Sequence, residues 1–295
     1  MGIPIGEHTP VKPNPKRAEW LLTGPSFIWL IVLFVLPTLL VFAIAFKPFN
    51  PDGQLGPGWT LDSIRGLANP NYPAIVWRTL SLSAITTLIC LIVGTPTAYF
   101  MARATRWRQT LLMLVIVPFW TSFLIRIFAW KVLLHPEGAI KNFLVFVGLA
   151  DASTVLLYRP EAVLLVLVYT SLPFAILPLY AASEKFDFSL LEAARDLGAT
   201  PWKAFLHIFV PGISRGLWTA MLMVLIPALG AYVIPDVVGG KEAEMIGNKI
   251  AQRTFNDRNL PHASGLSAIL SLVILLPLVL GQTWQWWNKR KAGKS

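Results

Sequence analysis

The sequence predicts an all-α integral membrane protein with six transmembrane helices, and two features of its composition carry this prediction. Of the 295 residues, 55% are hydrophobic and only 14% are charged, whereas an average soluble domain has about 25% charged residues. Several windows contain about 20 apolar residues, enough for a helix to cross a hydrocarbon core of about 30 Å. In such a chain the net charge of +10 reflects Lys and Arg placed beside the membrane and does not indicate nucleic-acid binding.

We assign the spans from the apolar runs that lie between charged, Pro-rich or Gly-rich segments. They cover residues 25–46, 75–101, 110–134, 161–182, 213–235 and 264–287. The first run is too long for the apolar region of a cleavable signal peptide and predicts an uncleaved helix. Pro96 is expected to kink the second span. Residues 140–149 are apolar but too few to cross the bilayer, which predicts an interfacial helix.

The distribution of Lys and Arg predicts the orientation of the spans. Six spans place four segments on one side: the tails at residues 1–24 and 288–295, the connection after the second span, and the charged stretch 189–211. Lys and Arg are denser in these short segments than in the longer loops of the opposite side. Because positive charge near span ends marks the cytoplasmic side, we expect both termini and residues 189–211 to be cytoplasmic.

The first half of the charged stretch predicts a short amphipathic helix. Ser189 and Glu192 have the spacing of an N-terminal capping box. Gly198 stands where a left-handed cap is expected to end the helix. The apolar residues at helical spacing on one face are Leu190, Ala193, Ala194 and Leu197.

The second half of the stretch predicts another short helix. Thr200 and Pro201 are suited to be its N-cap and first residue, and Pro211 is expected to stop it. Its apolar face comprises Trp202, Phe205, Leu206 and Phe209. Two capped helices held outside the bilayer favour contact with a partner protein.

The same stretch resembles a known motif. Glu192-Ala193-Ala194, then Gly198, then Ile208-x-Val210-Pro211 resemble the EAA loop of the inner-membrane subunits of bacterial binding-protein-dependent ABC importers, except that Val210 replaces the usual leucine. The resemblance implies a cytoplasmic coupling helix that docks on an ATPase. The implied coupling residues are Glu192, Ala193, Ala194, Asp196, Gly198, Ile208 and Pro211. It also implies a permease core of five helices, at residues 75–287, with a peripheral first helix.

A second resemblance bears on the solute. Pro118–Trp130 is similar to the corresponding span of spermidine/putrescine-type permeases, a subgroup that includes importers of opines and other small amino compounds. It implies a polyamine as the solute, with an opine, an amino-acid derivative or another small organic solute as the alternative. The implied partners are a homologous second permease, a cytoplasmic ABC ATPase dimer and a periplasmic or lipoprotein substrate-binding protein, beside membrane lipid. No cofactor is implied.

Candidate residues for the solute path lie within the spans, except for Asp236 at the outer end of the fifth span. Arg126 is the one unambiguous charge deep in a span, where a charge costs at least about 2.5 kcal/mol. It either lines the path or holds helices together. Arg126 would repel a polycation unless neutralised, which leaves a zwitterionic solute open. Aromatic faces and a carboxylate that suit a cation, or that merely pack, are Trp120, Trp130, Tyr169, Phe174, Tyr180, Tyr232 and Asp236.

The sequence contains no motif for chemistry of its own. It has no GxxxxGK[ST] phosphate loop and no GxSxG elbow. Its four histidines are scattered, and its single cysteine is Cys90, so the pattern predicts neither a metal site nor a disulfide. We therefore expect a transport subunit and not an enzyme. A stand-alone channel or secondary carrier is the alternative, although no selectivity loop or ring of charge is evident.

Overall fold

A computed structural model describes residues 15–50, 55–151 and 153–292. This part of the chain is helical, and its only extended pairing is an isolated bridge between Phe49 and Leu55. Among these residues four helices are long and apolar enough to cross a membrane, or six if each of two bent helix pairs counts as one span. The predicted all-α membrane class is therefore confirmed.

The first apolar run forms a peripheral helix. It comprises α1 (Pro15–Leu30), a π-helical turn at Ile31–Val35 and α2 (Leu36–Ile44). None of the 18-residue membrane window within Thr23–Ile44 is buried, and α2 packs against α15 (Leu260–Ala292). Residues 15–24 of the predicted tail are helical and continue directly into the first apolar run, and residues 1–14 lie outside the described part.

Three long helices pack side by side in the core: α4 (Tyr72–Arg103), α8 (Pro160–Glu184) and α12 (Ser214–Leu229). Small residues let their backbones approach closely, as is usual between membrane helices. A side chain at Gly216 would collide with Ala182. The small residues fully buried in this core are Cys90, Ala98, Ala175 and Ala220. Pro96 lies inside α4 without interrupting it.

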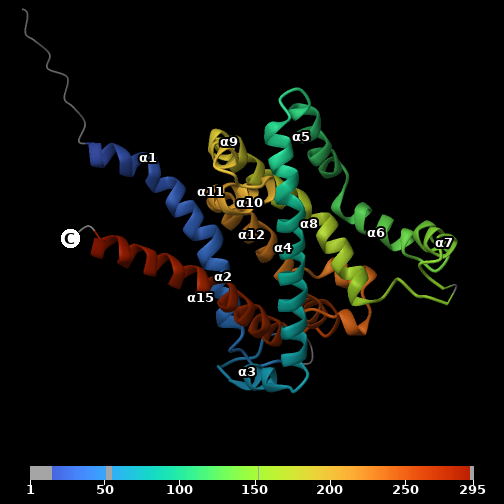
Figure 1. The fold of residues 1–295 in the computed structure, drawn as a ribbon. Helices are drawn as coiled ribbons and strands as arrows, with labels where there is room; N and C mark the ends of the chain where they lie inside the picture. The colour runs from blue at the N-terminus through green and yellow to red at the C-terminus, as the bar shows by residue number, and fades with distance from the viewer. Residues whose placement is uncertain (1–14, 51–54, 152, 293–295) are drawn as a thin grey trace, which may run out of the picture.

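The third predicted span, 110–134, is not one continuous helix. It consists of α5 (Arg108–Ile116), a 3₁₀ turn at Val117–Trp120 and α6 (Phe123–Leu133), with a bend of 89°. Pro118 has no amide hydrogen to continue the helical ladder. The hydroxyl of Thr121 donates to the Pro118 carbonyl at 2.8 Å, and Thr121 itself is extended. The bend points α6 away from α4 (Figure 1), and α6 packs against α13.

The fifth predicted span, 213–235, is also interrupted. Helix α12 ends at Leu229, and α13 (Val233–Val238) follows after a break at residues 230–232. Gly230 weakens a helix through its backbone entropy. Pro235 cannot donate to the carbonyl four residues earlier, at Ala231. The break places Tyr232 between two helices.

The remaining elements surround this core. They are α3 (Asp62–Arg65), a 3₁₀ turn at Gly66–Ala68, α7 (Ala139–Phe146), a 3₁₀ turn at Lys241–Ala243, α14 (Ile246–Ala251) and a π-helical turn at Gln252–Asn256. Helix α7 corresponds to the expected interfacial helix. Helix α15 continues to Ala292, so the tail predicted from residue 288 is helical as far as that residue. Helices α5 and α9 (Ser189–Asp196) lie at one end of α4, and α3 lies at the other (Figure 1).

Candidate functional site

The charged stretch forms the two helices expected from its sequence. Helix α9 ends in a Schellman motif, in which Gly198 has a φ of 89°. The amide of Gly198 donates to the Arg195 carbonyl at 2.9 Å, and the amide of Ala199 donates to the Ala194 carbonyl at 3.0 Å. The predicted left-handed cap is confirmed.

The capping box predicted at the start of α9 is wrong. Ser189 is the first helical residue, and its amide donates to the carboxylate of Asp187 at 3.0 Å. Hydrogen bonds from the side chain and the amide of Ser189 lower the pKa of Asp187 from its ordinary value. Asp187 takes the capping role because Phe188 already has helical dihedral angles. Glu192 is thus left exposed at the surface.

The second helix comprises α10 (Pro201–Ala204), a π-helical turn at Phe205–Phe209 and α11 (Val210–Gly212). The Thr200 hydroxyl accepts the Lys203 amide at 3.4 Å, so the predicted N-cap is confirmed. The helix continues one residue beyond Pro211. It then bends by 73° into α12. A side chain at Gly212 would collide with the ring of Phe186, so glycine permits this close approach.

An aromatic cluster joins this stretch to the core. The ring of Phe209 is fully buried and lies 4.9 Å from the ring of Tyr99 in α4, measured between centroids. The rings of Phe186 and Phe205 lie 5.2 and 5.3 Å from the Phe209 ring. Such pairs stabilise beyond the area that they bury. The stretch is therefore anchored to α4 through packed rings.

The outer face of α9 carries apolar side chains that this chain leaves uncovered. Leu197 is 90% exposed and Leu190 is 50% exposed. The predicted apolar face is corrected at Ala194, which is buried, as is Leu191. Ala193, Glu192 and Asp196 share the exposed side, Ile208 is half-buried against the core, and Pro211 is exposed. An exposed apolar surface of this kind, bordered by charges, is typical of a protein interface.

A cavity of about 410 Å³ lies between α6, α8, α12 and the break at residues 230–232. The guanidinium of Arg126 lies 5.4 Å from the ring centre of Phe119 and 5.9 Å from that of Phe123. Its Nε is buried and has no hydrogen-bond partner among the described residues. The rings therefore stabilise the charge at the cavity wall. Phe174 and Tyr232 line the same cavity.

The other predicted path residues lie elsewhere. The rings of Trp130 and Tyr169 pack edge-to-face 5.3 Å apart and do not line this cavity. Trp120 is 78% exposed just before the bend. Tyr180 is buried beside Arg108, near the α5 end of α4. For these four residues the solute-path role stays a prediction.

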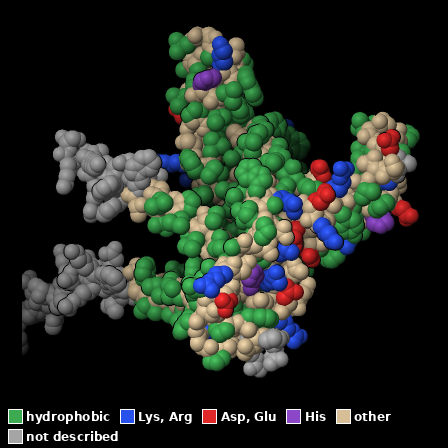
Figure 2. Space-filling view, turned by 90° about the horizontal axis from the view of Figure 1, so that it is seen from below, with side chains coloured by type: hydrophobic (Ala, Val, Ile, Leu, Met, Phe, Trp, Pro, Cys, Tyr) green, Lys and Arg blue, Asp and Glu red, His purple; other side chains and the backbone are tan. Residues whose placement is uncertain are grey.

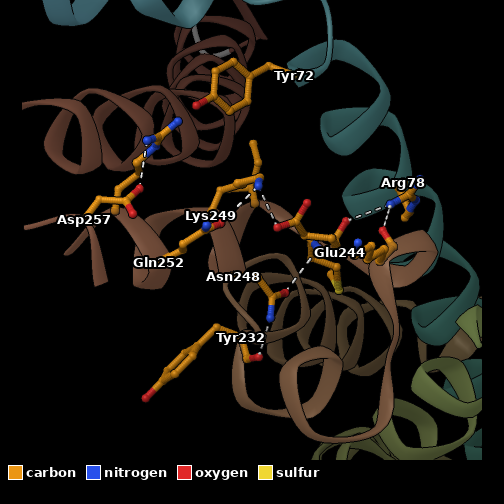
Figure 3. Close-up of polar contacts among 12 residues, drawn as sticks. Tyr72, Arg78, Tyr232, Glu244, Asn248, Lys249, Gln252 and Asp257 are labelled. Atoms are coloured by element: carbon orange, nitrogen blue, oxygen red, sulfur yellow. Dashed lines mark hydrogen bonds and ion pairs between the residues drawn. The ribbon is translucent and has the colours of Figure 1, made fainter. Parts of the chain in front are cut away.

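A polar hollow of about 640 Å³ adjoins this cavity, because Tyr232 lines both. Asp236 lines the hollow, as do Glu244 and Lys249, whose carboxylate and ammonium lie 2.8 Å apart. Asn248 donates to the Tyr232 carbonyl at 3.0 Å and accepts the Met245 amide at 3.2 Å (Figure 3). Figure 2, which views the molecule from below, shows acidic and basic side chains close together on this face.

The sequence did not single out Glu244, Asn248 and Lys249 as site residues, because they lie in the polar connection between the fifth and sixth predicted spans. One local signal could have found Asn248. It stands three residues after Met245, at the spacing by which a side chain caps the start of a helix, and it makes that hydrogen bond at α14.

The chain is a bundle of membrane helices with a cavity between its spans. A pair of capped helices is anchored at one end of the bundle. These features together are those of a transport subunit. The model of the family described as the inner membrane component of binding-protein-dependent transport systems matches residues 93–293. The chain belongs to this family. It is a multi-pass permease subunit of the bacterial inner membrane.

Individual relatives and solved structures agree with the family. The spermidine/putrescine transport system permease protein PotB of Haemophilus influenzae is 39% identical over 255 residues, covering 86% of this chain and 88% of the relative. PotB of Escherichia coli K12 is 37% identical over 253 residues, with coverage of 85% and 92%. A crystal structure of a bacterial ABC transporter that imports alginate has a chain of TM-score 0.72 and 19% identity, covering 92% of this chain and 96% of that one. The last likeness shows the fold alone.

Proposed function

We propose that this permease subunit forms half of the path by which an ATP-driven importer takes up a polyamine such as spermidine or putrescine. The observation that carries the proposal is the 37–39% identity to PotB proteins over 85–86% of the chain. An aromatic cavity wall with Phe174 and Tyr232 suits a desolvated alkylammonium chain. The alternative, an opine or amino-acid derivative, would place a carboxylate beside Arg126.

The subunit acts with partners. A homologous second permease completes the path, two copies of a cytoplasmic ABC ATPase hydrolyse ATP, and a periplasmic or lipoprotein binding protein delivers the solute. This chain itself carries out no hydrolysis. Helix α9 docks on the ATPase through the exposed face with Leu190, Ala193 and Leu197. Glu192 and Asp196 offer carboxylates to basic groups of the ATPase at the edge of this face.

Transport proceeds by alternating access. Closure of the ATPase dimer moves α9 and the 201–212 helix, and the packed rings around Phe209 carry this movement to α4. The cavity then opens outward and accepts the solute, and hydrolysis resets it. Both termini and the 189–212 stretch are cytoplasmic, which is supported by the density of Lys and Arg. The start of α1 and the end of α15 lie on the same side of the molecule (Figure 1).

Uptake into proteoliposomes tests this function. The chain is co-expressed with a homologous second permease, an ABC ATPase and a substrate-binding protein from the same organism, and import of radiolabelled spermidine and putrescine is measured with and without ATP. We expect ATP-dependent import of both. Import of an opine or amino-acid derivative in place of polyamines would overturn the substrate assignment. Flux by the isolated chain without ATP would show a channel or carrier instead.

A further inference from the structure

The ion pair between Glu244 and Lys249 forms a wall between two polar hollows. One is the 640 Å³ hollow that reaches Tyr232, and the other, of about 390 Å³, reaches Arg78 in α4. Both hollows are lined by Glu244 and by Lys249. The side chains of the pair are 28% and 23% exposed. The pair is thus partly desolvated yet reachable from either side.

Lys249 can leave this pair without losing all its partners. Its ammonium also donates to the side-chain oxygen of Gln252 at 3.1 Å. The backbone at Glu244 is held in place, because the guanidinium of Arg78 donates to the backbone carbonyls of Lys241 and Glu244 at 3.2 and 3.3 Å (Figure 3). The lysine, which has a second partner for its ammonium, is therefore the movable member of the pair, and the Glu244 backbone is tied to α4.

The hollow also continues toward the cavity with Arg126. Tyr232 lines both spaces, and Asn248, directly before Lys249 in the chain, holds the Tyr232 carbonyl. A solute that reaches Glu244 is thus in the hollow whose lining includes Tyr232, the residue shared with the cavity. Asp236 lines the same hollow and offers a second carboxylate to a solute with more than one ammonium group.

We propose that Glu244 is an exchangeable ammonium site at the entrance of the path, where a primary ammonium of the solute replaces that of Lys249. This inference rests on the proposed import of polyamines. The exchange substitutes one primary ammonium for another, so the charge and hydrogen bonding of Glu244 are conserved, and Lys249 turns to Gln252. Lys249 acts as a tethered competitor. It sets the affinity of Glu244 for the solute. It also disfavours solutes that lack an ammonium group, because they cannot replace it.

The two members of the pair should therefore respond to mutation in opposite directions. Binding of radiolabelled spermidine is measured on the purified complex of both permeases and the ATPase, without binding protein. Lys249→Met leaves the carboxylate without its competitor, and the Kd for spermidine should fall several-fold. Glu244→Gln leaves an unpaired ammonium that repels the solute, and the Kd should rise roughly tenfold. A merely structural pair would weaken binding or assembly in the same direction for both variants.

Two control variants make the test specific. Lys241→Met removes another lysine of the same hollow and should leave the Kd within about twofold of the wild type, since bulk charge is a weaker effect than a direct contact. Lys249→Arg keeps a cation and should also stay near the wild-type value. The proposed exchange would be overturned if Lys241→Met and Lys249→Met raised the affinity for spermidine equally. It would also be overturned if Lys249→Met and Glu244→Gln both lowered that affinity. If the wild-type complex neither binds nor imports polyamines, the proposed function fails instead.

Discussion

The ring of Tyr99 in α4 stands edge-on to the ring of Phe209 in the charged stretch, with centroids 4.9 Å apart and planes at 77°. A second edge-on contact joins Tyr99 to Phe205 at 5.4 Å. These two contacts connect the helix at residues 201–212 to a core helix that runs to the opposite end of the molecule. A movement imposed on the stretch must displace α4 or break this packing.

The first prediction concerns Phe209. Replacing it by alanine leaves a cavity in a fully buried cluster, a change that typically costs about 3–5 kcal/mol. We expect Phe209→Ala to lower the number of solutes imported per ATP hydrolysed, because the stretch then moves without α4. Phe209→Leu, which keeps most of the buried volume, should retain most of this ratio. Parallel losses of import and hydrolysis, with the ratio unchanged, would reduce Phe209 to a packing residue.

The second prediction concerns the cap at Asp187. Asp187→Ala should speed amide hydrogen exchange at Ser189 and in the first turn of α9, because the amide of Ser189 loses its acceptor. The pKa of Asp187 is lowered in the folded protein from 3.8. Its stabilisation is therefore fully present above the unfolded pKa and is lost as the pH falls through the lower folded value.

The ratio of the amide exchange rates of Asp187→Ala and the wild type should accordingly be constant from neutral pH down to about the unfolded pKa of Asp187. Asp187→Asn is the matched control, since an amide oxygen also caps helices but does not ionise in this range. A difference that disappears between pH 7 and 5 would show that another titrating group controls the start of α9.

The third prediction concerns docking of the ATPase. Glu192→Lys reverses a charge on the exposed side of α9, where the side chain makes no ion pair within the described residues. The Tm of the isolated subunit should stay near the wild-type value, while less ATPase co-purifies and solute-stimulated hydrolysis falls. Glu242→Lys makes the same change at an exposed acid outside the charged stretch and should leave both the ATPase yield and hydrolysis unchanged. Wild-type hydrolysis and import by Glu192→Lys would contradict the docking role.

Local features of this fold could be predicted from the sequence, whereas the breaks and the distant contacts could not. The caps at Gly198 and Thr200 were predictable because each depends on a few neighbouring backbone groups. The breaks after Pro118 and at Gly230 were not, because apolar runs continue through both and proline is often accommodated in membrane helices. The cap at the start of α9 was misplaced because Phe188 is already helical, so the carboxylate of Asp187 accepts the Ser189 amide that Glu192 was expected to bind.

The candidate site was predictable to a similar extent. Arg126 and Tyr232 could be singled out as a charge and an aromatic ring in apolar runs, and both line the cavity. The network that joins Arg78, Tyr232 and Glu244 could not be predicted, because these residues lie far apart in the sequence and meet only when α4, α13 and α14 pack. The contact between Trp130 and Tyr169 could not be predicted either, because it joins residues of α6 and α8 that meet only in the folded chain.

The last prediction concerns Arg126. The described lining of its cavity contains no carboxylate, so the guanidinium presents an uncompensated positive charge to a solute. Arg126→Gln should raise import of spermidine more than import of putrescine, because repulsion grows with the charge of the solute. Arg126→Lys keeps the charge and should keep the wild-type ratio. Initial rates of both solutes, measured on complexes of equal yield, test this. Loss of the assembled complex with Arg126→Gln, but not with Arg126→Lys, would assign Arg126 to holding α6 against its neighbours and not to the path.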